Sequence, residues 1–324
     1  MKYKKFNLLK IVTCLTLLML IIIACNNDDV NINKPTTVNF NSAPDATILS
    51  TGNVEIITEN TVRYHVLNFN AGGYTSTIVE TETTATLIDV GSQVNEGAEM
   101  RAYANAINKP LSVIITHDHP DHYGNISNFS DVPVFAHTEA AADLAANTGF
   151  TTMYSTAINV VDDSQVIGGL EFKFANIPNA ETAENGYIFI PSLGVLFPGD
   201  LMYNGRHNYI REYTPLDSVD ELDNWITGLN QLKNDFGNYN RVFVGHIGTH
   251  TDIPTLIDAN IEYLRNAQGL IKGTKELTSG SFATSVQEVV DELALLYPNL
   301  ISGALTLALP DAFFPGDPGA NWFE

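Results

Sequence analysis

Residues 116–122 constrain this chain more than any other part of its sequence. They read Thr-His-Asp-His-Pro-Asp-His and directly follow the apolar run 111–115. Such a run, bounded by a polar turn, predicts a buried strand. Three of the eight histidines in the 324-residue chain fall in this segment, so we interpret it as a metal site at the end of a rigid strand. The alternative is a polar turn that happens to be rich in histidine.

The spacing within this segment favours two groups of metal donors. His117 and His119 are separated by one residue, so both imidazoles can face the same side of an extended chain. Pro120 then bends the chain, and Asp121 and His122 can present a second group beside the first. Imidazole and carboxylate groups are the usual donors of catalytic zinc sites. The sequence therefore predicts two neighbouring groups of donors.

The pattern His-x-His-x-Asp-His resembles the signature of the metallo-β-lactamase superfamily. Two later segments resemble other parts of that family in the expected order: 194–200 closes with Gly-Asp, and 241–246 closes with Gly-His. The resemblance implies that Asp200 bridges two metals and that His246 is the last ligand. The upstream segment 86–91 resembles the family's early strand and contains Asp89, which the resemblance implies is an outer support that orients a ligand imidazole by a hydrogen bond.

One ligand departs from the family pattern. The family normally supplies a third histidine upstream of the bridging aspartate, but this chain has no histidine between His137 and His207. Glu181 stands 200 − 181 = 19 residues before Asp200, at the spacing expected for the missing histidine. We predict that Glu181 is the ligand, with Glu184 as a weaker candidate. The remaining possibility is that the ligand is lost and one metal position is empty.

The resemblance implies the complete set of ligands. It assigns His117, His119 and Glu181 to one metal, Asp121, His122 and His246 to the other, and Asp200 to both. We expect two divalent metal ions, with zinc as the default. Manganese and iron are alternatives, because three carboxylates add oxygen donors that suit harder metals. A water shared by two metals loses a proton near neutral pH and becomes a nucleophile, and Asp121 is the expected proton acceptor.

The expected activity is that of a metal-dependent hydrolase acting on an ester-type bond, namely a sulfate ester, a carboxylic ester or a lactone. The segment around Glu181 looks somewhat like that of alkyl sulfatases, where a glutamate also replaces the histidine. A β-lactam hydrolase is an alternative, disfavoured because β-lactamases usually have Cys or His where Asp200 stands. The sequence also leaves open a mononuclear iron oxidoreductase of the same fold and a non-catalytic binding lipoprotein.

The resemblance implies an α/β fold, an αββα sandwich of two βα halves with the metal site between the sheet edges. We expect strands near 53–57, 62–69, 74–80, 84–90 and 111–115, and helices over 96–108, from 218, over 254–271 and over 284–297. The first helix should bury Ala102, Tyr103, Ala106 and Ile107. A capping box at Ser218–Glu221 should open the second helix, which should bury Leu222, Trp225, Ile226, Leu229 and Leu232. Five further polar residues are weaker candidates for contacts at the site: His137, Arg206, His207, Arg211 and His250.

The N-terminus predicts export. Residues 1–5 are basic and residues 8–24 are almost wholly apolar, the layout of a secretory signal peptide. Cys25 follows Ile-Ile-Ala, which resembles a bacterial lipobox. We expect a lipoprotein signal peptide over 1–24, a flexible tether over 25–50 and the hydrolase domain, with C-terminal helices, over 51–324. A lipid on Cys25 would anchor the chain to the bacterial membrane in the cell envelope, facing the periplasm or the surface; a transmembrane anchor is the alternative.

Composition narrows the class of partners. The formal net charge is −21, and removal of four lysines with the signal peptide gives −21 − 4 = −25. Affinity for nucleic acid depends on Lys and Arg, so this charge argues against nucleic-acid substrates. We expect a small-molecule substrate. The other cysteine, Cys14, lies within the signal segment, so the mature protein is expected to have no disulfide. The sequence leaves the oligomeric state open.

Overall fold

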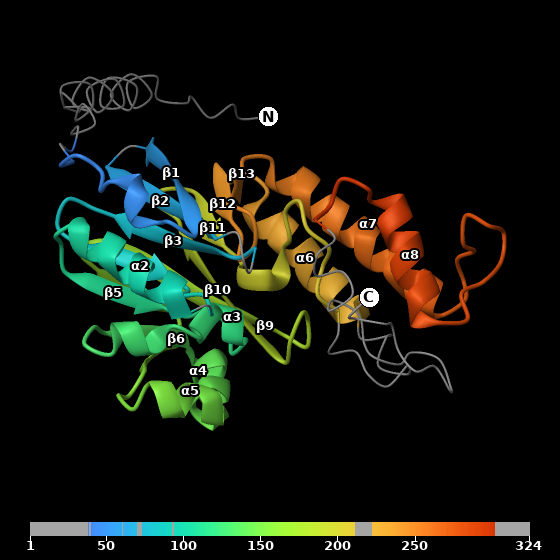
Figure 1. Cartoon of the computed structure of the whole chain (residues 1–324), viewed down its shortest axis with the longest axis horizontal. Coiled ribbons are helices and arrows are strands. Elements are labelled where there is room, and N and C mark those ends of the chain that lie inside the picture. Colours follow the sequence, from blue (N-terminus) through green and yellow to red (C-terminus); the bar gives the residue numbers. More distant parts are fainter. Residues whose placement is uncertain are drawn as a thin grey trace, which may run out of the picture. The chain divides into compact units, whose positions relative to one another are not determined.

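Two β-sheets packed face to face form the centre of the domain (Figure 1). The computed structural model describes residues 38, 40–59, 61–69, 73–92, 94–210 and 222–301, all within the unit Val38–Glu324. The lipobox cysteine Cys25, the Ser218–Glu221 capping box, Arg211 and the tail after residue 301 lie outside the described residues. Within the described ranges, no helix has both the length and the apolar character that crossing a bilayer requires.

The first sheet combines an antiparallel half with a parallel half. Its strands follow chain order: β1 (Gly52–Glu59), β2 (Val62–Phe69), β3 (Thr75–Glu80), β4 (Ala85–Ile88), β5 (Leu111–Ile114), β6 (Val134–His137) and β7 (Asn159–Val161). The pairs from β1 to β4 are antiparallel, and those from β4 to β7 are parallel. Every residue of β3 and β4 is buried, as expected for strands covered on both faces.

The second sheet is mostly antiparallel. Its spatial order is β13 (Thr249–His250), β12 (Arg241–Phe243), β11 (Val195–Phe197), β10 (Glu184–Ile190), β9 (Leu170–Pro178) and β8 (Ser164–Ile167). The pair β11–β12 is parallel, and helix α6 (Leu222–Phe236) lies between these two strands in the chain. A parallel pair needs such a crossover connection. Both strands therefore end at the same edge, where Asp200 and His246 follow them.

Helices cover the outer faces of both sheets (Figure 1). Helices α2 (Val94–Ala106), α3 (Pro120–Tyr123), α4 (Thr138–Ala146) and α5 (Thr148–Met153) pack on the first sheet, and α6, α7 (Ile253–Ile271) and α8 (Val286–Leu296) pack on the second. Short 3-10 helices occur at Ala46–Ile48, Ile126–Phe129 and Gly199–Leu201. One apolar core lies between the sheets and one under each helical layer. The predicted αββα sandwich is confirmed.

The buried face predicted for helix α6 is confirmed, and the one predicted for helix α2 is partly wrong. Helix α6 buries all five of the apolar residues expected of it, including Trp225, whose Nε1 donates a hydrogen bond to the Leu201 carbonyl. For α2 the prediction was partly wrong, because Ala102 and Ala106 are exposed. The buried apolar residues are Met100, Tyr103 and Ala104, together with Ile107 directly after the helix. The bulkier Met and Tyr side chains set the helix rotation, since burying them removes more apolar area from water than burying alanine.

Candidate metal centre

The histidine-rich segment leaves the carboxyl end of β5. Helix α3 begins directly after His119, with Pro120 in its first turn, where a missing N–H costs no helical hydrogen bond. This short helix turns Asp121 and His122 back toward the strand end, and the His122 amide donates to the His119 carbonyl. The bend expected at Pro120 thus places the second pair of donors beside the first.

A tight turn between β9 and β10 carries Glu181. The buried Asn185 side chain holds this turn: its Nδ2 donates to the carbonyls of Ile177 and Thr182, and its Oδ1 accepts from the Thr182 amide. Glu181 itself is fully buried. A Cβ on Gly186 would lie 2.4 Å from the Thr116 carbonyl oxygen, so only glycine lets β10 approach the histidine segment this closely.

The Gly-Asp and Gly-His pairs at the ends of β11 and β12 also reflect close packing. A Cβ on Gly245 would lie 2.2 Å from Asp200 Oδ1 and 2.8 Å from His122 Cε1. Gly199 has φ +55°, a conformation that glycine adopts without strain. Glycine before each donor therefore allows Asp200 and His246 to enter the same crowded space.

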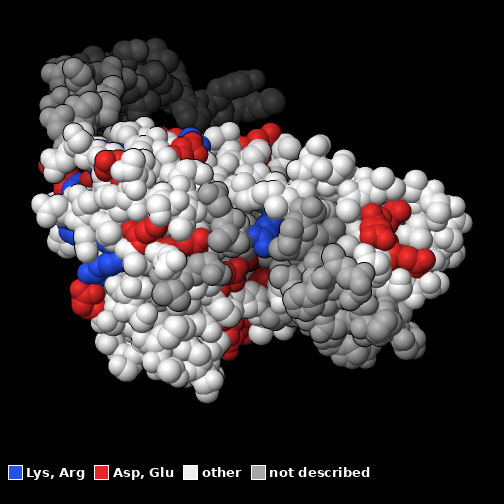
Figure 2. Space-filling model, in the orientation of Figure 1, with Lys and Arg blue, Asp and Glu red and all other residues white. Residues whose placement is uncertain are grey.

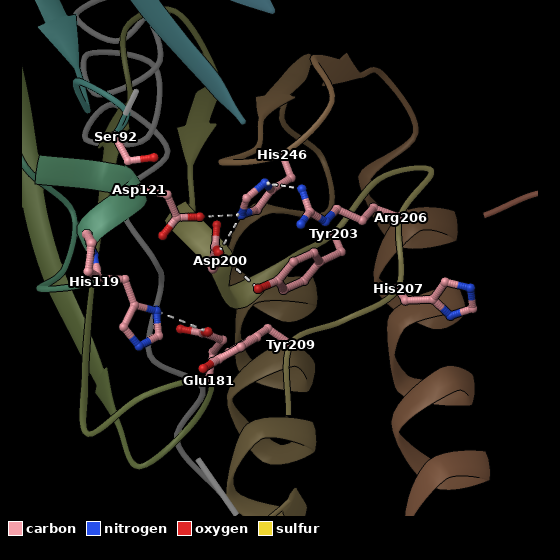
Figure 3. A pocket seen from close by; sticks show the side chains of 11 residues that line it. Ser92, His119, Asp121, Glu181, Asp200, Tyr203, Arg206, His207, Tyr209 and His246 are labelled. Atoms are coloured by element: carbon pink, nitrogen blue, oxygen red, sulfur yellow. Dashed lines mark hydrogen bonds and ion pairs between the residues drawn. The ribbon is translucent and has the colours of Figure 1, made fainter. Parts of the chain in front are cut away.

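The seven predicted site residues converge in two adjacent groups of possible metal donors: Asp121, His122, Asp200 and His246; and His117, His119 and Glu181. Within each group the donor atoms lie within 4.8 Å of one another. The imidazole rings of His117 and His122 link the groups, with centroids 4.0 Å apart. Figure 3 shows His119 facing Glu181, and Asp121, Asp200 and His246 facing one another nearby.

Distances within the groups are those of side chains that share a common centre. In the smaller group, Glu181 lies 3.3 Å from His119 Nδ1 and 3.7 Å from His117 Nε2. In the larger group, His246 Nε2 lies 2.9 Å from Asp200 Oδ2 and 3.4 Å from Asp121 Oδ2. His246 and Asp200 are thus in direct hydrogen-bonding contact, and imidazole and carboxylate groups brought together in this way are the donors that catalytic zinc sites use.

Three buried atoms in these groups support such a role. His117 Nε2, His122 Nε2 and Asp200 Oδ1 make no hydrogen bond within the described part of the chain, although His122 Nε2 and Asp200 Oδ1 form an ion pair at 3.3 Å. Buried polar atoms are nearly always hydrogen-bonded, and exceptions that point toward one place indicate an ion or another missing partner. The residues present therefore fit a pair of metal ions.

The electrostatics of the larger group reflect its crowded carboxylates. Burial alone would lower the pKa of His246, but Asp200 and Asp121 outweigh it and raise this pKa to about 9. The pKa of His122 is likewise raised well above its usual value, since Asp200 and Asp89 outweigh burial. The pKa of His117, by contrast, is lowered by burial and by the neighbouring His122. A neutral His117 is ready to ligate, because metal-bound imidazole is neutral.

Asp89 occupies the supporting position expected of it. Its carboxylate accepts from His122 Nδ1 at 2.8 Å and from the amide and hydroxyl of Thr116, each at 2.8 Å. Its backbone has φ +58°, which is uncommon outside glycine. The turn is fixed by hydrogen bonds from the Asp89 amide to the Ile114 carbonyl and from the Val90 amide to the His122 carbonyl.

Two supports of the larger group were not anticipated. The Tyr203 hydroxyl donates to Asp200 Oδ2 at 2.9 Å, and its ring stacks on His246 with centroids 5.4 Å apart. The Gly73 carbonyl lies 2.9 Å from His246 Nδ1 and accepts from Arg206 Nη1 at 3.3 Å. Tyr203 could have been suspected from its place three residues after Asp200, whereas a backbone carbonyl gives no sequence signal.

Helix α7 holds the segment that carries Tyr203. Asn260 is buried on this helix; its Oδ1 accepts from the Tyr203 amide and its Nδ2 donates to the Tyr203 carbonyl, each at 2.9 Å. Asn208 Nδ2 donates to the same Oδ1 at 2.9 Å. A single amide side chain thus fixes both ends of the loop that follows Asp200.

The donor groups open into a cavity of about 300 Å³. Its lining comprises donor residues and side chains from the segment after Asp200: Ser92, His119, Pro120, Asp121, Glu181, Asp200, Tyr203, Arg206, His207, Tyr209 and His246. Figure 2 shows Asp and Glu side chains spread over this face of the molecule, with red atoms visible in the hollow near its middle. The cavity is large enough for a small molecule.

The weaker candidates divide between the cavity and the periphery. Arg206 and His207 border the cavity, but His207 Nδ1 meets the Tyr263 hydroxyl at 3.1 Å and its ring is directed away from the donors (Figure 3). Burial lowers the pKa of His207 to about 4. His137 instead pairs with Glu139 at 2.7 Å, and His250 accepts from the Asp252 amide outside this cavity.

Comparison with known proteins agrees with this architecture. Residues 70–251 match the model of the metallo-beta-lactamase superfamily, more than half of the chain, so the protein belongs to that superfamily. Similar solved structures include a metallo-beta-lactamase from Pontibacter korlensis (21% identity, 66% of this chain, 99% of that chain, TM-score 0.53). Another is the metallo-beta-lactamase FIM-1 from Pseudomonas aeruginosa in its mono-zinc form (16%, 66%, 96%, 0.50). At these identities the likeness shows the fold alone. No curated protein matches the sequence.

Replacing Glu181 with Ala is expected to reduce the bound metal from about two ions to about one per chain, because the smaller group keeps only two of its three protein donors. Glu181→His should retain both metals, since imidazole restores a donor. Elemental analysis after dialysis measures the difference. Glu184→Ala is the matched control, because Glu184 accepts a hydrogen bond from Asn176 and belongs to neither group. If Glu181→Ala retains the metal content of the wild type, Glu181 is no ligand.

Proposed function

We propose that this protein is a hydrolase that holds two divalent metal ions and cleaves an ester-type bond in a small molecule. The convergence of seven donor side chains in two adjacent buried groups carries the proposal. His117, His119 and Glu181 would hold one metal, Asp121, His122 and His246 the other, and Asp200 would contact both. Zinc is the default metal for this set of donors, with manganese and iron as alternatives.

When bound, a metal pair supplies a hydroxide nucleophile near neutral pH and polarises the bond under attack. The residues of the chain prepare the site for that chemistry. Asp121 lines the cavity 3.4 Å from His246 Nε2, where its carboxylate would accept a proton. Tyr203 and the Gly73 carbonyl fix Asp200 and His246. Arg206, beside His246 at 3.2 Å, places a positive charge at the cavity wall.

The donor set supports an ester-type substrate over a β-lactam. An oxygen donor stands at Asp200, where β-lactamases usually have Cys or His. The similar solved structures are metallo-beta-lactamases. This likeness is compatible with β-lactam hydrolysis but does not favour it over hydrolysis of an ester. Sulfate esters, carboxylic esters and lactones are the substrates to test first.

Asp121→Ala is expected to lower turnover by at least about 100-fold, because it removes the proton acceptor and a donor together. The measurement is the hydrolysis rate of chromogenic sulfate ester, carboxylic ester, lactone and β-lactam substrates by metal-loaded protein, with circular dichroism to verify folding. Asp118→Ala is the control, since Asp118 lies three residues away and belongs to neither group. An unchanged rate in Asp121→Ala would contradict the assignment. A single bound iron with oxygen consumption would favour an oxidoreductase instead.

We also propose that the chain is tethered to the cell envelope through a lipid on Cys25, as the lipobox-like sequence Ile-Ile-Ala-Cys supports. Expression in bacteria fed a labelled fatty acid should label the wild type and leave Cys25→Ser unlabelled. Stable anchoring requires more than one acyl chain, so the labelled protein should remain with the membrane fraction after a high-salt wash. Absence of label from the wild type would rule out this anchor.

A further inference from the structure

The carboxylate of Asp89 is shared by ligands of both metal groups. It accepts directly from His122 Nδ1, a member of the larger group. It also accepts from the hydroxyl of Thr116, and that hydroxyl oxygen lies 3.0 Å from Nδ1 of His117, a member of the smaller group. Asp89, Thr116 and both histidines are buried. A continuous chain of short contacts therefore links one carboxylate to each metal position.

The direction of each proton in this chain follows from the available donors. An ionised carboxylate can only accept, and a hydroxyl has one proton. The Thr116 hydroxyl must therefore donate to Asp89, which leaves its lone pairs for His117. His117 Nδ1 then carries the proton and donates to Thr116, so the lone pair of His117 stands on Nε2. That Nε2 is the nitrogen which lies 3.7 Å from Glu181.

We propose that Thr116 is a positioning residue, the relay through which Asp89 sets the tautomer and ring orientation of His117 and so supports the smaller metal group as well as the larger one. This inference rests on the proposed two-metal site. One second-layer carboxylate then orients a ligand of each metal: His122 directly and His117 through a hydroxyl. Loss of such a supporting hydrogen bond typically lowers metal affinity about 10- to 100-fold.

The packing around Thr116 keeps its hydroxyl in place. The Thr116 amide donates to Asp89 Oδ1, so the backbone and the side chain of Thr116 both donate to the same carboxylate. A Cβ on Gly199 would lie 3.0 Å from Thr116 Oγ1. The backbone that follows β11 therefore packs closely against the Thr116 hydroxyl. Because valine has nearly the shape of threonine, Thr116→Val removes the hydroxyl while keeping the volume.

The decisive experiment is a competition titration of the full-length chain with Zn²⁺ against a chromophoric chelator. Thr116→Val should weaken one of the two zinc affinities about 10- to 100-fold, and Thr116→Ser should remain close to the wild type. In a Glu181→Ala background, which keeps the larger group, adding Thr116→Val should weaken the remaining affinity far less than adding Asp89→Asn does, because His122 still donates to Asp89 directly. Adding Asp89→Asn to the same background should weaken it about 10- to 100-fold. Equal affinities in Thr116→Val and the wild type would overturn the relay.

A control and a second measurement separate the possible failures. Thr86→Val removes a buried hydroxyl from β4, next to β5, and should leave both zinc affinities unchanged. Nitrogen NMR of the zinc-loaded wild type should find the His117 proton on Nδ1 and zinc on Nε2; the reverse assignment would overturn the relay even if Thr116→Val fails to fold. If the wild type binds no zinc, the proposed function fails. If it binds two ions and Thr116→Val does not differ, only this inference fails.

Discussion

Buried negative charge is the constraint on which the site depends. The side chains of Glu181 and Asp200 are almost wholly removed from solvent, and a buried carboxylate persists only when positive charge or hydrogen bonds compensate it. His117 and His119 adjoin Glu181, and His122 and His246 adjoin Asp200. Without metal, the protonated forms of His122 and His246 can supply positive charge to Asp200. A metal ion would replace those protons, so metal binding and proton release are coupled.

The topology explains how residues distant in the sequence meet at this charge. The parallel pair β4–β5 ends with Asp89 and the histidine segment, and the parallel pair β11–β12 ends with Asp200 and His246. Carboxyl ends of paired parallel strands share an edge of their sheet, and the two sheets pack face to face. The β9–β10 turn adds Glu181 to the same place. The apolar cores hold these strand ends in place, and their side chains supply no metal donors.

The sequence could predict donors that follow strands, and it could predict little else about the site. Polar residues that directly follow an apolar run, such as His117 and Asp200, can be predicted as donors because the adjacent sequence alone places them at the end of a strand. The role of the Gly73 carbonyl depends on backbone placed by contacts far along the chain, so no residue type signals it. The role of Asn260 could not be predicted either. This residue lies on a helix beyond the residues that match the family, and it hydrogen-bonds to the loop after Asp200. The buried face of α2 was predicted partly wrongly because it was judged in part from two alanines, and burying an alanine side chain contributes little free energy.

The metal content of the full-length chain, purified without chelator and analysed by elemental analysis, tests the central claim most directly. This account predicts about two ions of zinc, manganese or iron per chain, because two complete groups of donors lie side by side. One ion per chain, even after reconstitution with excess metal, would mean that the group containing Glu181 does not bind. No metal at all would contradict the account, since the buried donors would then have a purely structural role.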